Sequence, residues 1–157
     1  MTLRLATSAD LHILLPLVAS YHAHEGITPR SGKALADTLL GLLEHPDRGR
    51  IWLIEQVGQP AGYLAIAFGY SIELGGREAA IDEIFVAPDH RGKGLGAEAL
   101  TAFLDWAKDE HLVAIHLDVA PDNAGARRLY ARLGFESFMG YDLMSCLLPS
   151  GIAPEGH

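Results

Sequence analysis

The chain has 157 residues, a length that suits one compact domain with its own hydrophobic core. Its residues are 49% hydrophobic and 20% charged, which excludes an intrinsically disordered chain. Twelve Lys and Arg against twenty Asp and Glu give a formal net charge of −8. This charge disfavours nucleic acid as a partner and favours the approach of cations such as amines.

The single cysteine, Cys146, allows no internal disulfide, and we expect it to be a small buried strand residue in a cytoplasmic protein. No apolar run approaches the roughly 20 residues of a membrane helix, so no membrane partner is expected. His22 and His24 stand two residues apart and would not face each other on a helix. We therefore expect surface histidines there and no metal site. Residues 1–148 are predicted to form one domain and 149–157 a flexible tail.

The first third of the chain predicts a strand and two helices. Residues 3–5 alternate like a short strand, and Thr7 with Asp10 resembles a helix start. Apolar residues then recur at helical spacing from Leu11 to Val18, with Pro16 expected to kink or split the helix. A second helix is predicted from Ser31 to about His45.

The rest of the chain predicts a mixed sheet. Glycine turns join strands over 51–54, 62–70 and 79–86 into an antiparallel meander. A helix over 95–110, a strand over 113–119, a helix over 123–133 and a last pair of strands within 135–148 follow. Strand, long helix and strand imply one parallel crossover. The predicted fold class is α/β, with a mixed, mostly antiparallel central sheet flanked by about four helices.

The segment IDEIFVAPDHRGKGLGAEAL, residues 81–100, predicts a phosphate-binding loop. A strand leads into the loop 91–96, which opens the long helix, and the first turn of a helix offers unpaired N–H groups and a positive dipole end. Gly92, Gly94 and Gly96 let a diphosphate approach the backbone, while Arg91 and Lys93 add positive charge.

A dinucleotide-binding site is the rival interpretation of this loop. Residues 94–99 satisfy the pattern G-x-G-x-x-G/A, and Asp118 lies at the end of the next predicted strand. In that fold, however, the first glycine follows its strand almost at once, whereas residues 87–93 intervene here. Three antiparallel strands also precede the unit. These features disfavour a nicotinamide-dinucleotide-binding domain without removing it.

Two motifs together resemble the GNAT superfamily of acetyl-CoA-dependent N-acetyltransferases. The first is the loop 91–96 after the strand residues Asp82-Glu83-Ile84-Phe85-Val86. The second is Asn123, then a helix carrying Tyr130, then residues 133–135 with the sequence Leu-Gly-Phe. The resemblance spans residues 3–148 and implies the acyl-CoA acyltransferase fold and acetyl-CoA as co-substrate. The central strand is similar to that of diamine and polyamine acetyltransferases, in which a Glu stands in place of Asp82.

The resemblance also assigns roles to residues. It implies that the cofactor arm bonds the backbone of Ile84, Phe85 and Val86, that Asn123 contacts this arm, and that Tyr130 lies near the thioester sulfur. The pyrophosphate is expected to bind backbone amides of the loop, which belong to Arg91, Gly92, Lys93, Gly94, Leu95, Gly96 and Ala97. Tyr21 and Glu25 are expected to contact the acceptor amine. Homodimers are frequent in the family, so a homodimer is expected.

The chemistry of acetyl transfer to an amine suits the same residues. An ammonium must lose a proton before it attacks, and Asp82 or Glu83 can accept that proton, directly or through water. Strand alternation places these two carboxylates on opposite faces, so at most one would face a given side of the cleft. Tyr130 can donate a proton to the leaving thiolate. A primary amine, either a small molecule or a peptide amine, is the expected acceptor for direct attack in a ternary complex. The alternative is a non-catalytic acyl-CoA-binding regulatory module.

Overall fold

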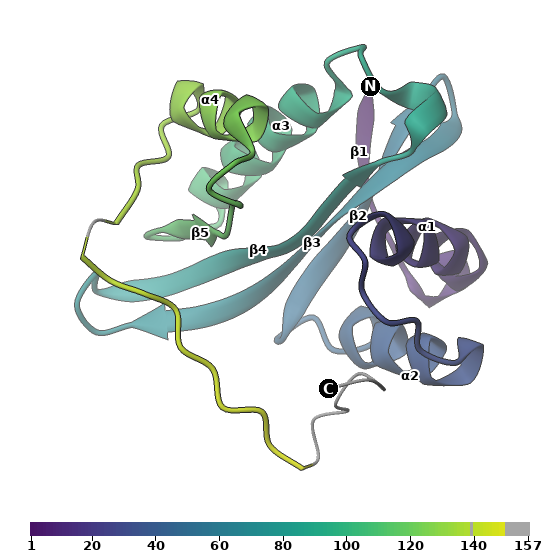
Figure 1. The fold of residues 1–157 in the computed structure, drawn as a ribbon, viewed down its shortest axis with the longest axis horizontal. Helices are drawn as coiled ribbons and strands as arrows, with labels where there is room; N and C mark the ends of the chain where they lie inside the picture. Colours follow the sequence, from purple (N-terminus) through teal and green to yellow (C-terminus); the bar gives the residue numbers. More distant parts are fainter. Residues whose placement is uncertain (139, 150–157) are drawn as a thin grey trace.

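The computed structural model describes residues 1–138 and 140–149, so residues 150–157 of the predicted tail lie outside the described residues. The described residues form a five-stranded sheet in the order β1-β2-β3-β4-β5, with helices on both faces (Figure 1). The elements are β1 (Thr2–Leu5), α1 (Leu11–His24), α2 (Gly32–Leu43), β2 (Gly49–Gln56), β3 (Gln59–Ser71), β4 (Gly76–Val86), α3 (Leu95–Asp109), β5 (Ile115–Leu117) and α4 (Ala124–Arg132). The predicted mixed α/β fold is confirmed.

Pairing along the sheet leaves one strand partly without a neighbour. Strands β1 to β4 are antiparallel, and α3 connects β4 to the parallel strand β5. β4 has 11 residues, but it pairs with β5 only over Ala79–Ile81. Within the described residues, the second half of β4 therefore has a strand neighbour on the β3 side only.

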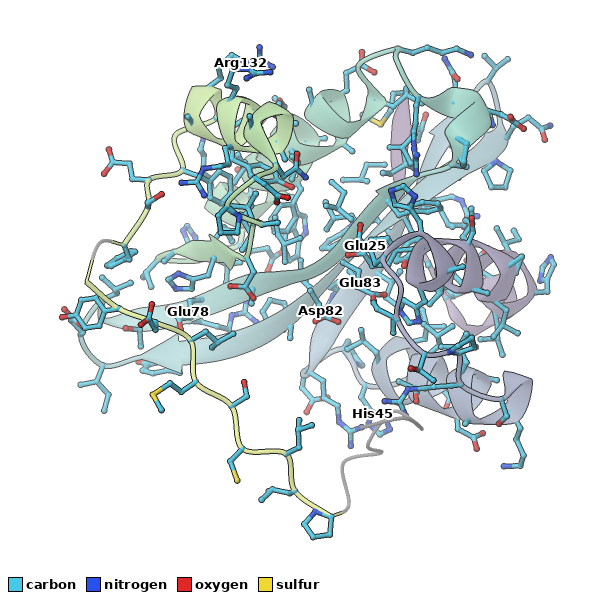
Figure 2. The ribbon with its side chains drawn as sticks, viewed as in Figure 1. Glu25, His45, Glu78, Asp82, Glu83 and Arg132 are labelled. Atoms are coloured by element: carbon cyan, nitrogen blue, oxygen red, sulfur yellow. The ribbon has the colours of Figure 1, made fainter. Side chains whose placement is uncertain are left out.

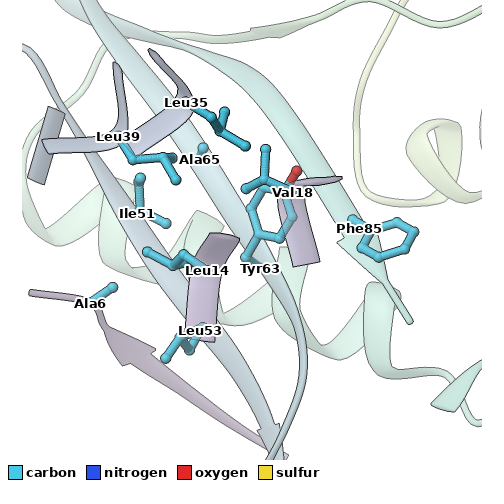
Figure 3. Packing of buried hydrophobic residues seen from close by; sticks show 10 residues of the cluster. All are labelled: Ala6, Leu14, Val18, Leu35, Leu39, Ile51, Leu53, Tyr63, Ala65 and Phe85. Atoms are coloured by element: carbon cyan, nitrogen blue, oxygen red, sulfur yellow. The ribbon is translucent and has the colours of Figure 1, made fainter. Parts of the chain in front are cut away.

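Two apolar layers enclose the sheet, because its central strands are apolar on both faces. On one face α1 and α2 pack through Leu14, Val18 and Leu35 against strand residues that include Leu53 and Tyr63 (Figure 3). On the other face α3 packs against the alternate strand residues; this cluster includes Trp52, Leu64, Ile66, Leu100 and Phe103. Burial of side chains of this size stabilises the fold by roughly 1.5–3 kcal/mol each. The layers hold β4 and α3 in fixed positions.

The helix α1 is not split at Pro16, although a split is one of the two outcomes expected from sequence. It runs from Leu11 to His24 as one element. A proline removes a single N–H donor from a helix, and the buried side chains of Leu14 and Val18 on either side of it are anchored on the sheet. Tertiary packing therefore outweighs the local effect of the proline. None of the helices in the described part of the chain is long and apolar enough to cross a bilayer.

The predicted last pair of strands is wrong for the described residues of 135–148, which form neither strand nor helix. Figure 1 shows the segment leaving α4, passing the β5 end of the sheet and running on toward the α2 side. A strand needs a neighbour for its backbone hydrogen bonds, and here an apolar pattern exists without one. Its large side chains, such as Phe138, Tyr141 and Met144, are exposed. Cys146, expected to be buried, is exposed too.

Candidate active site

The loop between β4 and α3 leaves open space in front of the helix. Gly92 and Gly94 adopt φ of 77° and 75°, the left-handed region that favours glycine. A Cβ built on Gly92, Gly94 or Gly96 would meet nothing within 4 Å. Gly96 has ordinary helical backbone angles, so its missing side chain matters for access and not for the turn. The loop is an open cradle, as the sequence predicts.

The backbone donors in this cradle are unpaired. Within residues 1–138 and 140–149, no backbone carbonyl accepts a hydrogen bond from the N–H of any residue from Gly92 to Ala97, and the residue before α3, Gly94, offers no capping side chain. The helix dipole adds positive potential at the same place. The exposed Lys93 adds a full charge. This arrangement can bind a large anion through several amides at once.

The open edge of β4 adjoins the cradle. In the antiparallel ladder, Phe85 pairs with Tyr63 and Ala87 donates to the carbonyl of Ala61. Since such ladders alternate, the backbone groups of Ile84 and Val86 point away from β3 and those of Phe85 point toward it. Of the three residues expected to bond the cofactor arm, Ile84 and Val86 therefore present free-edge groups, whereas Phe85 is engaged with β3.

Arg91 lies across the end of β4 and not in front of the amides. Its Nε donates to the Val86 carbonyl at 2.8 Å, and its guanidinium carbon lies 5.3 Å from the centre of the Phe85 ring. The rest of the side chain is exposed. A ligand arm along β4 would compete with Arg91 for this carbonyl, which would free the guanidinium for a phosphate.

A β-bulge in β4 corrects the expectation that Asp82 and Glu83 lie on opposite faces. Ala65 pairs with Glu83 and Ile66 with Ile81, which leaves Asp82 as an extra residue in the strand. Figure 2 shows both carboxylates beside α1. Asp82 is exposed, yet the surrounding protein partly desolvates its carboxylate and raises its pKa. The bulge thus delivers two carboxylates to one site.

Glu83 is held by two neighbours that the sequence did not indicate. The Tyr63 hydroxyl donates to Glu83 Oε1 at 3.0 Å, and His22 Nε2 lies 2.6 Å from Glu83 Oε2. The side chains of His22 and Glu83 are only 15% and 19% exposed. The expected surface histidine is therefore a site residue. No local signal reveals it, because α1 and β4 meet only in the folded chain.

Tyr21 lies close to several of the predicted site residues. Its ring packs against Phe85 with centroids 5.6 Å apart. The pKa of Tyr21 is raised to about 12, mainly by burial and further by nearby groups, which are Glu25, Glu83, Asp82 and Tyr130. All of these therefore lie within electrostatic range of one hydroxyl. The predicted acceptor residues Tyr21 and Glu25 thus lie near Asp82 and Glu83 on the α1 side of β4, whereas Tyr130 packs in the apolar cluster on the α3 side of the sheet.

Two predicted site residues belong to α4: Asn123 caps its N-terminus, and Tyr130 lies within it. The Asn123 side chain accepts from the Ala126 N–H at 3.2 Å, so it caps α4. Tyr130 packs against the Phe135 ring, with the ring centroids 5.9 Å apart. Burial raises the pKa of Tyr130, so its hydroxyl is protonated at neutral pH.

Comparison with known proteins decides the family. Residues 18–135 match the model of the Acetyltransferase (GNAT) family. The chain belongs to this family. It is similar to an uncharacterized N-acetyltransferase of Methanocaldococcus jannaschii, with 33% identity over 138 residues that make up 86% of this chain and 60% of the relative. The chain thus spans less than two thirds of that relative's length.

Solved structures agree with this GNAT assignment. An integron cassette protein from the mobile metagenome of Cole Harbour Salt Marsh is 32% identical, with a TM-score of 0.81 over 94% of this chain and 91% of that one. A predicted acetyltransferase with acetyl-CoA from Clostridium acetobutylicum shares the fold at 23% identity, with a TM-score of 0.73 over 92% of this chain and 95% of that one. The rival interpretation as a nicotinamide-dinucleotide-binding domain is therefore wrong.

Proposed function

We propose that the chain is an acetyl-CoA-dependent N-acetyltransferase that moves an acetyl group to a primary amine by direct attack in a ternary complex. The observation that carries the proposal is the row of unpaired amides from Gly92 to Ala97, which opens beside the free edge of β4. The carboxylates of Asp82 and Glu83 lie on the same strand. The loop offers an anion site, the strand edge can bind the cofactor arm, and the two carboxylates attract cations.

The cofactor would bind across the loop and the strand. The amides of residues 92–97 bind the diphosphate, aided by Lys93 and by Arg91 once it leaves the Val86 carbonyl. The pantetheine arm extends along the free edge of β4 and bonds the backbone of Ile84 and Val86. Asn123 keeps its capping bond and offers its side-chain NH₂ to the arm.

The acetyl transfer would proceed in one sequence of bonds. A carboxylate of β4 takes a proton from the acceptor ammonium, directly or through water, and the neutral nitrogen attacks the thioester carbonyl carbon. A backbone N–H on the free edge of β4 stabilises the resulting oxyanion. The C–S bond then breaks and the Tyr130 hydroxyl gives its proton to the thiolate sulfur. The attacking nitrogen loses its second proton, which returns through solvent to the Tyr130 oxygen and leaves the neutral amide. The half-buried Tyr130 phenol carries the proton that this step needs at neutral pH.

Cationic amines fit the acceptor side of the cleft. Three carboxylates, Glu25, Asp82 and Glu83, lie around Tyr21 and attract positive charge. We propose diamines and polyamines as the first acceptor class, since a second ammonium can remain paired with a carboxylate while the first one reacts. The short side chain of Asp82 favours a bridging water between its carboxylate and the amine.

A panel of amines with acetyl-CoA tests this function. Released thiol measures turnover, and mass spectrometry identifies a product heavier by one acetyl group. We expect kcat/KM to rank diamines and polyamines above monoamines, and monoamines above amines that also carry a carboxylate. Tight acetyl-CoA binding without transfer to any amine would instead support the non-catalytic acyl-CoA-binding module.

We also propose that the enzyme works as a homodimer. The exposed apolar side chains of the C-terminal segment, including Phe138, Tyr141, Leu143 and Met144, support a partner surface there. A second copy of this chain is the proposed occupant. Light scattering of the purified protein should give the mass of two chains, and the mass of one chain would contradict the proposal. The free thiol of Cys146 is compatible with a reducing compartment such as the cytoplasm.

A further inference from the structure

The two carboxylates of the β4 bulge differ in how they are held. Both oxygens of Glu83 have partners, Tyr63 at 3.0 Å and His22 at 2.6 Å. The side-chain carboxylate of Asp82 has no hydrogen-bond or ion-pair partner within the part of the chain that the structure describes. A carboxylate with two fixed partners stays in place, whereas one without partners can accept a proton and turn toward a substrate.

We propose that His22 is a positioning residue: with Tyr63, it fixes Glu83 as a stationary carboxylate and leaves Asp82 as the carboxylate that takes the acceptor's proton. This inference rests on the proposed function and assigns separate roles to two acids that the sequence does not distinguish. In the proton-transfer step, the N–H bond of the acceptor ammonium breaks and an O–H bond forms on Asp82, directly or through one water. Glu83 keeps its charge and attracts the ammonium.

The groups that face this pair come from α1 and β3. Helix α1 contributes Tyr21, His22 and Glu25, and strand β3 contributes Tyr63. Among these groups His22 is the one that can carry positive charge, and it lowers the pKa of Asp82, opposing the increase caused by burial. Loss of the His22 side chain should therefore raise the pKa of Asp82 and keep the base protonated up to a higher pH.

The test compares His22→Gln and His22→Ala with His24→Gln, a matched control two residues along the same helix whose side chain is exposed. Carbon-detected NMR titration of the side-chain carboxyls needs no activity. We expect the Asp82 titration to move to higher pH in both His22 variants and to remain unchanged in His24→Gln. An Asp82 titration that does not move in either His22 variant overturns the proposal, whether or not the wild type acetylates an amine.

Kinetics then separate positioning from a purely structural role. Since Gln keeps a donor but not the charge, His22→Gln should recover most of the kcat that His22→Ala loses, about tenfold, when measured at high pH. The acid limb of its kcat/KM profile should still lie at higher pH than that of the wild type, with KM for acetyl-CoA unchanged. Variants with wild-type kcat and an unmoved acid limb would overturn the proposal. A wild type that binds acetyl-CoA and acetylates nothing would instead refute the proposed function.

Discussion

The N-termini of α2 and α3 differ in whether a side chain caps the free backbone N–H groups of the first turn. At α2, the Ser31 hydroxyl accepts the Ala34 N–H at 3.1 Å, and the first turn is capped by the chain itself. At α3, Gly94 precedes the helix and no capping side chain is present. A missing cap costs about 1 kcal/mol of helix stability. The helix α3 is therefore less stabilised at its N-terminus than α2, and its first amides are free to bind a ligand.

The largest expected effect is on acetyl-CoA binding, when a carboxylate is placed at the start of α3 instead of α2. Gly96→Glu places a carboxylate in the open space before α3, and Gly32→Glu makes the same change in the first turn of α2, where a Cβ also meets nothing within 4 Å. Repulsion of about 4 kcal/mol between close charges predicts that Gly96→Glu weakens acetyl-CoA binding about a thousandfold. Isothermal titration calorimetry measures the Kd.

The α2 variant is the matched control for that measurement. Gly32→Glu should bind acetyl-CoA like the wild type, because the two substitutions have similar effects on helix propensity and net charge but only one faces the cradle. Both variants should unfold no more readily than the wild type, since an acid in the first turn of a helix is favourable. Equal Kd values for the two variants would show that the α3 terminus does not bind the cofactor.

A smaller effect separates α3 from α4, the helix that carries the phenol. Tyr130→Phe removes the proposed proton donor and keeps the packing against Phe135. We expect kcat to fall about a hundredfold, at the lower end of general acid catalysis, with the Kd of acetyl-CoA unchanged. Steady-state kinetics with calorimetry check both values. Full turnover by the variant would remove Tyr130 from the mechanism.

The smallest effect compares the two capped helices. Ser31→Ala and Asn123→Ala each delete a capping acceptor, and each should lower the free energy of unfolding by about 1 kcal/mol in urea denaturation. Only Asn123→Ala should also weaken acetyl-CoA binding, because Asn123 is the cap proposed to contact the cofactor arm. If both variants bind acetyl-CoA with the wild-type Kd, Asn123 caps α4 but does not contact the cofactor.

Sequence reasoning succeeded where the signal is local. The loop with Gly92, Gly94 and Gly96 has the predicted open geometry, because turn conformation and the start of a helix depend on a few adjacent residues. The meander and the parallel crossover follow from turn positions and from the change of apolar period. For the same reason, the capping role of Asn123 could be anticipated from its place before a helix.

The remaining features depend on contacts between distant segments. The bulge that brings Asp82 to the side of Glu83 arises from the pairing of β3 with β4, and no residue pattern marks it. His22 contacts Glu83 only because α1 packs beside β4 in the folded chain, since the two residues are 61 positions apart in the sequence. The segment 135–148 shows the opposite error: its strand pattern is present, but within the described residues no neighbouring strand pairs with it.

One measurement tests the central claim most directly: two-dimensional ¹⁵N–¹H NMR of the labelled protein titrated with coenzyme A. We expect the amide resonances of residues 92–97 to shift strongly as the diphosphate accepts their hydrogen bonds, while those of residues 32–34 at the capped start of α2 do not move. Saturating coenzyme A with shifts confined to other parts of the chain, and none at residues 92–97, would contradict it.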